Sequence, residues 1–237
     1  MRGNQLAELR HGMYTEPLSE SCRRILERGE HALVGVSAGN SYFDQERLTA
    51  LLEWARRTFA EVDVVYVDTH IDTMLVADGR TPEYAARSAR STVKDVRRRI
   101  RRAVERVDPD GLRIRVRALS ELQDTPEYRE VRRRTDRALL EDAGFAATCE
   151  EMVGQVLEHR TGRGAGATTA HWEAGMGYVR AEAPLFVDAP TVFNVPSSMV
   201  CYHMNTPIST HLVQPDSTFR VAPGHGHMIV KPSTPDS

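Results

Sequence analysis

The sequence predicts an α/β fold, Rossmann-like, with a mostly parallel sheet flanked by helices. Short apolar runs typical of buried strands alternate with longer segments of helical periodicity. The chain has 237 residues, of which 41% are hydrophobic, and this suffices for a substantial core in one domain. A turn rich in small residues follows the first apolar run, where sheets of this kind bind their ligands.

The expected strands are short and apolar. The first covers residues 31–37, and the second, residues 62–67, reads Val-Asp-Val-Val-Tyr-Val. The third, residues 112–119, alternates arginine with apolar side chains. Further strands are expected near residues 185–187, 192–195, 199–204 and 227–231.

Helices are expected between these strands. They cover residues 19–28, 46–60, 82–107, 126–142 and 145–159, and a last one runs from 168 or 169 to 183. Two of them share a start signal, in which a capping threonine precedes a first-turn proline and an acidic residue (Thr81 and Thr125). Pro184 is expected to end the last helix, because proline cannot donate a helical hydrogen bond.

We expect a single domain over residues 1–237, with flexible segments at 1–13 and 232–237. The apolar runs are far shorter than the roughly 20 residues that span a bilayer. The first residues lack the apolar core of a signal peptide, so a cytoplasmic location is expected.

Cysteine and histidine spacing indicates neither disulfides nor a metal. Cys22, Cys149 and Cys201 are widely spaced and odd in number, which favours buried thiols over a disulfide framework. His225 and His227 lack companion ligands at a suitable spacing, so no metal site is expected.

The net charge is −2, yet the helix expected at 82–107 is strongly basic. Nine lysines and arginines lie between Arg87 and Arg106, opposed only by Asp95 and Glu105. A helix face of one sign is unfavourable unless an anion compensates it, and nucleic-acid phosphates would do so. A solvated surface is the simpler alternative.

Ser37 is the leading candidate nucleophile. Residues 35–39 read Gly-Val-Ser-Ala-Gly, which fits the nucleophile elbow of serine hydrolases. In those enzymes several strands precede the elbow, whereas Ser37 ends the first. A hydrolase triad with Asp188 and His203 is therefore kept only as an alternative.

Two further motifs carry ionisable groups. Tyr178 and Glu182 lie four residues apart on an expected helix and so share one face. Either they are a half-exposed tyrosine and a solvated carboxylate, or Glu182 binds a cationic amino group in a pocket. Tyr202 lies in an apolar strand, where a core tyrosine is the simpler interpretation.

Taken in order, these motifs resemble those of the cyclodipeptide synthases. The matching segments are residues 35–41, Tyr178 with Glu182, and residues 195–198 followed by Cys-Tyr-His at 201–203. The resemblance covers most of the chain and is nearest to an actinobacterial member that joins phenylalanine and leucine. It implies a fold similar to the catalytic domain of class I tyrosyl- and tryptophanyl-tRNA synthetases. It also implies that two aminoacyl-tRNAs are the substrates, without a cofactor or metal.

The resemblance assigns roles to individual residues. Ser37 takes the first aminoacyl group as an ester, Tyr178 and Glu182 hold its amino group, and Tyr202 relays protons as the cyclic dipeptide forms. Gly35 and Asn40 lie where backbone amides stabilise the developing oxyanion. One departure is His203, because the branch with asparagine and tyrosine at the Asn40 and Tyr202 positions often has glutamine next.

The resemblance also implies binding surfaces. The first aminoacyl side chain is assigned to Leu33, Val65, Leu119, Leu185 and Val200. The second site is assigned to Met152, Gln155, His159, His203 and Met204. The tRNA-binding residues are Lys94, Arg97, Arg98, Arg101 and Arg102. An apolar pocket discriminates weakly between similar side chains, so several hydrophobic products are expected.

Further implied features are a place in secondary-metabolite and antibiotic biosynthesis, and a downstream oxidase that modifies the cyclic dipeptide. The alternatives are the Ser-His-Asp esterase and a non-catalytic tRNA-binding module that uses only the basic helix.

Overall fold

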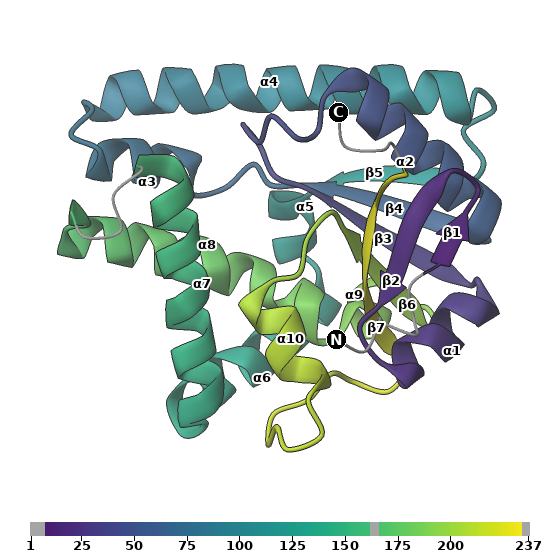
Figure 1. The fold of residues 1–237 in the computed structure, drawn as a ribbon. Helices are drawn as coiled ribbons and strands as arrows, with labels where there is room; N and C mark the ends of the chain where they lie inside the picture. The colour runs from purple at the N-terminus through teal and green to yellow at the C-terminus, as the bar shows by residue number, and fades with distance from the viewer. Residues whose placement is uncertain (1–7, 162–165, 234–237) are drawn as a thin grey trace.

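The structure is a computed structural model that describes residues 8–161 and 166–233. Within these residues a seven-stranded sheet runs in the order β1-β2-β7-β6-β3-β4-β5 (Figure 1). Strands β3 to β7 are parallel, and β1 and β2 add antiparallel at one edge. The strands are β1 (Glu8–Arg10), β2 (Met13–Pro17), β3 (His31–Val36), β4 (Glu61–Tyr66), β5 (Ile114–Ala118), β6 (Ser198–Tyr202) and β7 (His225–Pro232).

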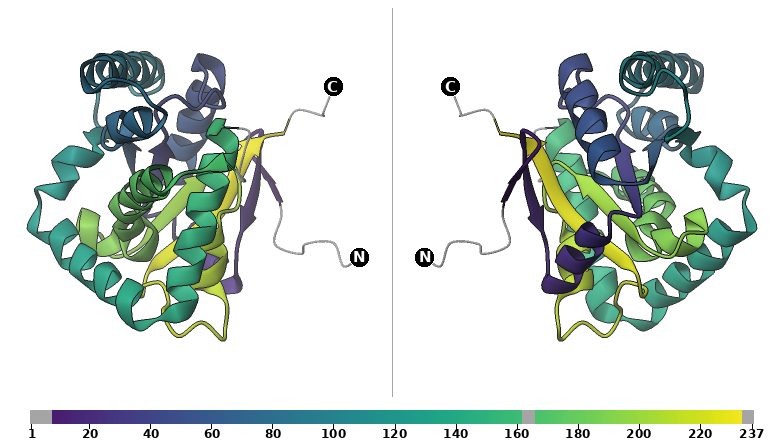
Figure 2. Two further views of the ribbon diagram at one scale, coloured as in Figure 1. Left: turned by 90° about the vertical axis from the view of Figure 1, so that its left-hand side faces the viewer. Right: turned by 90° about the vertical axis from the view of Figure 1, so that its right-hand side faces the viewer.

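Helices cover both faces of the sheet (Figure 2). The first core lies under α1 (Glu20–Arg28), α2 (Gln45–Thr58) and α4 (Pro82–Val107). The second core receives side chains from α3 (Ile71–Ala77), α5 (Leu119–Gln123), α6 (Pro126–Glu141), α7 (Ala143–Thr161), α8 (Thr169–Val187), α9 (Ala189–Phe193) and α10 (Pro207–Val213). The prediction of a mostly parallel α/β sheet flanked by helices is confirmed.

Successive side chains of each central strand point alternately into the first and the second core. Val34 and Val64 face the first core, whereas Leu33 and Val65 face the second. Because both faces are covered, the strands are apolar almost throughout, as is typical of parallel sheets. Helix α4 begins after the Thr81 cap and ends at Val107, as expected, and buries Val96 and Ile100.

Two of the expected late strands are wrong. Residues 185–187 continue α8 beyond Pro184, and residues 192–195 fall in α9 and the turn after it. Short apolar runs do not distinguish a buried strand from a buried helix. The buried contacts of Leu185 and Val187 in the second core compensate for the hydrogen bond that Pro184 cannot make.

The expectation of flexible ends is also wrong in part. Residues 8–17 form a β-hairpin whose turn places His11 and Gly12 at positive φ, as two-residue hairpin turns require. Met13 is buried and pairs with Pro232, and the Ser233 amide donates to the Gly12 carbonyl at 3.2 Å. Residues 1–7 and 234–237 lie outside the described residues.

Across the described ranges, the structure has no helix that is both long enough and apolar enough to cross a bilayer. The same ranges hold no group of three or more histidine, cysteine or acidic side chains arranged for a metal ion.

Candidate active site

Ser37 lies at the point in the sheet where the order of strand addition reverses, between β3 and β6. The chain passes from β3 to β4 and β5 on one side, and from β6 to β7 on the other. Ser37 directly follows β3, and Tyr202 ends the neighbouring strand β6. Ligands of open α/β sheets bind at the carboxyl ends of the strands at such a switch point.

The turn after β3 is built by small residues. The Asn40 amide donates to the Ser37 carbonyl at 3.3 Å, and Gly39 has φ +82°, a conformation that glycine adopts without strain. An added Cβ at Gly35 would meet no atom within 4 Å, so this glycine leaves open space beside the strand end. A glycine inside a strand often marks a place where a ligand approaches the backbone closely.

Two tyrosine hydroxyls lie next to the Ser37 hydroxyl. The Tyr202 hydroxyl is 3.3 Å from Ser37 Oγ, and the Tyr178 hydroxyl donates to the same atom at 3.5 Å. Tyr178 comes from α8, so three segments distant in sequence meet here. The Asn40 side chain hydrogen-bonds Tyr202, and its Oδ1 also accepts from the Tyr42 amide at 2.9 Å.

Glu182 follows Tyr178 by one helical turn and hydrogen-bonds its hydroxyl. Burial raises the pKa of Glu182 to about 7, although the Tyr178 hydrogen bond partly opposes this effect. Burial also raises the pKa of Tyr178, aided by the charge of Glu182, and burial raises that of Tyr202. Near neutral pH the two tyrosines are therefore hydrogen-bond donors, and Glu182 can gain or lose a proton.

A cavity of about 600 Å³ opens onto Ser37. Of the residues expected at the site, the following border it: Ser37, Asn40, Tyr178, Tyr202, His203, Met152, Gln155 and Met204. The His203 ring stacks on Tyr42, with ring centroids 3.9 Å apart. His159 lies near the end of α7, where its side chain is outside the described part of the structure.

The five residues assigned to the first aminoacyl side chain lie together but do not line this cavity. All five are buried in the second core, and Leu33 of β3 is the register partner of Val200 of β6. Tyr178 packs against the same core. The set therefore forms an apolar layer against which Tyr178 packs.

Several cavity residues were missed by the sequence analysis. Val67 and His70 follow β4, Ile71, Met74 and Leu75 belong to α3, and Ser88 and Thr92 belong to α4. The polar run Asp68-Thr69-His70 directly after a buried strand was the available signal, because parallel strands end at a common edge.

The basic helix α4 presents its cations to solvent. Lys94, Arg97, Arg98, Arg101 and Arg102 are all exposed. Arg98 pairs with Asp95 at 3.1 Å and Arg101 with Glu105 at 3.5 Å, whereas Arg99 turns inward and donates to the Phe43 carbonyl. Because Ser88 and Thr92 line the cavity, α4 connects the basic surface to the site.

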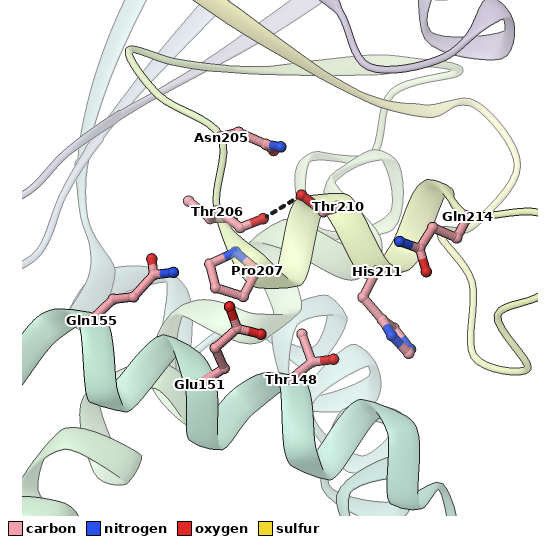
Figure 3. Close-up of a pocket in the computed structure, with 9 residues that line it drawn as sticks. All are labelled: Thr148, Glu151, Gln155, Asn205, Thr206, Pro207, Thr210, His211 and Gln214. Carbon is pink, nitrogen blue, oxygen red and sulfur yellow. Dashed lines mark hydrogen bonds between the residues drawn. The ribbon is translucent and has the colours of Figure 1, made fainter.

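A second cavity of about 400 Å³ adjoins the first between α7 and α10 (Figure 3). Its lining is mostly polar and includes Glu151 and His211. Gln155 and Thr206 border both cavities.

The hydrolase alternative lacks its acid. Asp188 is buried and accepts from Arg134 at 2.7 Å and from the Thr191 hydroxyl at 2.9 Å. The Ser37 hydroxyl itself contacts the hydroxyls of Tyr202 and Tyr178.

Comparison with known proteins decides the family. A family profile described as cyclodipeptide synthase matches residues 13–232. The chain belongs to the cyclodipeptide synthase family. The chain is 55% identical to the cyclo(L-leucyl-L-phenylalanyl) synthase of Streptomyces noursei, over 94% of this chain and 93% of that protein. This family consists of enzymes, and the resemblance inferred from three separated motifs is confirmed.

Solved structures agree with this result. A crystal structure of a cyclo(L-leucyl-L-phenylalanyl) synthase has TM-score 0.90 and 54% identity, and the match covers 94% of this chain and all of that one. A Mycobacterium tuberculosis structure has TM-score 0.88 and 36% identity, covering 98% and 99% of the two chains. That structure relates cyclodipeptide synthetases to type I tRNA synthetases, and its fold matches the fold expected here.

Proposed function

We propose that this synthase joins two aminoacyl groups delivered by aminoacyl-tRNAs, through esters formed on Ser37. The observation that supports this is a serine hydroxyl within reach of two neutral tyrosines, beside a carboxyl group with pKa about 7. No histidine base is required, because the ester arrives activated and its departing ribose oxygen accepts a proton.

In the first step a bond forms between Ser37 Oγ and the aminoacyl carbonyl carbon. The bond from that carbon to the ribose oxygen breaks, and the serine proton ends on the ribose oxygen. Glu182 and Tyr178 hold the amino group of the bound residue. Backbone amides around Gly35, near the end of β3, and Asn40, in the turn that follows, stabilise the oxyanion.

In the second step the amino group attacks the ester carbonyl carbon of a second aminoacyl-tRNA, and Glu182 accepts a proton from the amine. The bond from that carbon to the ribose oxygen breaks, and Glu182 passes the proton on to the departing ribose oxygen. This forms a dipeptidyl ester on Ser37. The new terminal amine then attacks the seryl ester carbonyl, the bond to Ser37 Oγ breaks, and the cyclic dipeptide is released. Tyr202 gives its proton to Ser37 Oγ and takes up the proton that the amine loses. The serine hydroxyl is restored.

Hydrophobic amino acids such as phenylalanine and leucine are the proposed substrates. The cavity has an apolar wall that includes Ile71, Met74 and Val156, and Tyr178 packs against an apolar layer. The name of the 55% identical relative agrees with this choice. The exposed cations of α4 suit tRNA phosphates, with Arg98, Arg101 and their neighbours as contacts. Such an enzyme works in the cytoplasm, where aminoacyl-tRNA is present. The proposed downstream partner is an oxidase that modifies the cyclic dipeptide.

The test is mass spectrometry of culture medium and of the intact protein. We expect cyclic dipeptides and an aminoacyl adduct with the unmodified chain, and neither with Ser37→Ala. Ser21→Ala, at an exposed position of α1, is the matched control and should behave like the unmodified chain. Product formation by Ser37→Ala would refute the covalent mechanism. Turnover of simple esters without tRNA would favour an esterase instead.

A further inference from the structure

His70 has an unusual backbone for a residue with a side chain. It directly precedes α3 with φ +61° and ψ +6°, in the left-handed region. Its carbonyl accepts from the Thr73 hydroxyl at 2.9 Å and from the Met74 amide at 3.3 Å, which holds this conformation. Glycine would adopt it at lower cost, and such strain gathers at functional sites.

The His70 ring is held against α8. A Cβ added at Gly177 would lie 3.1 Å from His70 Nδ1 and 3.2 Å from Cε1, so the ring occupies the space that glycine leaves. Gly177 directly precedes Tyr178, the tyrosine that donates to Ser37. The imidazole therefore has a fixed place beside the catalytic groups.

The polar atoms of the ring are nevertheless not hydrogen-bonded to the described part of the protein. Among the described residues neither ring nitrogen has a hydrogen-bond partner, and the half-buried side chain borders the same cavity as Ser37. Burial lowers the pKa of His70, so the ring is neutral at pH 7. A neutral imidazole offers one donor and one acceptor.

The rest of an aminoacyl ester already has partners in the proposed function. Tyr178 and Glu182 take the amino group, the turn amides take the carbonyl oxygen, and apolar walls take the side chain. The remaining polar group near the ester is the neighbouring ribose hydroxyl, which both donates and accepts a hydrogen bond. Its chemistry matches that of the unpaired imidazole.

We propose that His70 is a substrate-binding residue that hydrogen-bonds the ribose hydroxyl next to the ester of the aminoacyl-tRNA. This rests on the proposed function and adds a residue to it. The left-handed backbone and the contact with Gly177 orient the ring before substrate arrives.

The test compares Ser37 acylation rates in single turnover for two probes. One is phenylalanyl-tRNA, and the other is phenylalanyl-tRNA whose terminal adenosine lacks the hydroxyl beside the ester. His70→Gly removes the ring and relieves the backbone, so it should fold. We expect it to acylate about tenfold more slowly with the first probe, as one hydrogen bond allows. With the second probe we expect the acylation rate of His70→Gly to be within about twofold of the rate of the unmodified enzyme with that same probe. This probe lacks the hydroxyl that His70 would bind, so removal of the ring removes no hydrogen bond.

His70→Asn keeps a residue that tolerates positive φ and a side chain that donates and accepts. We expect it to recover most of the rate with the first probe. Equal losses with both probes in His70→Gly would overturn the proposal in favour of a purely structural role. A change in which amino acids are used, with no dependence on the hydroxyl, would overturn it too. Absence of acylation in the unmodified enzyme would instead refute the proposed function.

Discussion

Glu182 should make the stability of this protein depend on pH in a direction opposite to most carboxylates. Its pKa is raised from the usual 4.5 to about 7 because burial disfavours the charged form. Below pH 4.5 the group is protonated in both the folded and the unfolded chain. Between about pH 4.5 and pH 7 the unfolded chain releases this proton whereas the folded protein keeps it, so the free energy of unfolding falls as pH rises across this range. Above about pH 7 both states are ionised and the dependence levels off.

The size of the effect follows from the two pKa values. The full difference corresponds to about 3 kcal/mol, by the conversion of pKa units into free energy. Most of it, about 2–3 kcal/mol, falls between pH 5 and pH 8.5 by the same linkage relation. Glu182→Gln keeps a similar shape and an acceptor for Tyr178 but carries no charge. Between pH 5 and pH 8.5 the stability of the variant relative to the unmodified protein should therefore rise by about 2–3 kcal/mol.

Urea unfolding of both proteins at pH 5 and pH 8.5 measures this difference, and groups common to both cancel. Glu173→Gln on the same helix is the control, because Glu173 is exposed and its variant should show no such change. The same carboxylate is the proposed proton acceptor, so Glu182→Gln should gain stability and lose product. A stability difference that is the same at both pH values would refute the argument that Glu182 is buried and protonated near neutrality.

Three further predictions concern other parts of the molecule. Burial lowers the pKa of His227 to about 4, so the folded protein resists charging this ring in acid. Between pH 7 and pH 4.5, the free energy of unfolding measured in urea should fall by about 2–3 kcal/mol less for His227→Gln than for the unmodified protein. A Cβ at Gly175 would lie 2.7 Å from a methyl carbon of Val153, so Gly175→Ala should lower the free energy of unfolding by about 1–3 kcal/mol. Gly154→Ala is the control, because its nearest contact would be 3.8 Å, and it should cause no loss of stability. Equal melting temperatures of the two variants would contradict this prediction. Replacing Arg98 and Arg101 with glutamine should weaken tRNA binding and reduce the slope of log affinity against log salt by about 2, with melting unchanged; an unaltered slope would exclude α4 as the phosphate contact.

Local signals in the sequence were enough for strands β3 to β7 and for the longer helices, but they missed the β1–β2 hairpin and the short helices α3, α5, α9 and α10. Helix α4 was predicted over its full length because a threonine cap, a first-turn proline and an apolar stripe act within a few residues of each other. Strands β3 and β4 were recognised because strands buried on both faces are continuously apolar. Where these signals were short or absent, as at residues 185–195, tertiary packing decided between helix and strand.

The sequence by itself determined the family, because three motifs in order are specific even when each alone is weak. It also indicated Ser37, Tyr178, Glu182 and Tyr202 as a group, through the resemblance. Only the tertiary structure decided that both tyrosine hydroxyls lie within 3.5 Å of Ser37 and that Glu182 is buried enough to hold a proton near pH 7. It also revealed His70, whose place depends on one strained backbone angle and on the space left by Gly177. Such distances and burial arise from contacts between segments far apart in the chain, and no local pattern of residues encodes them.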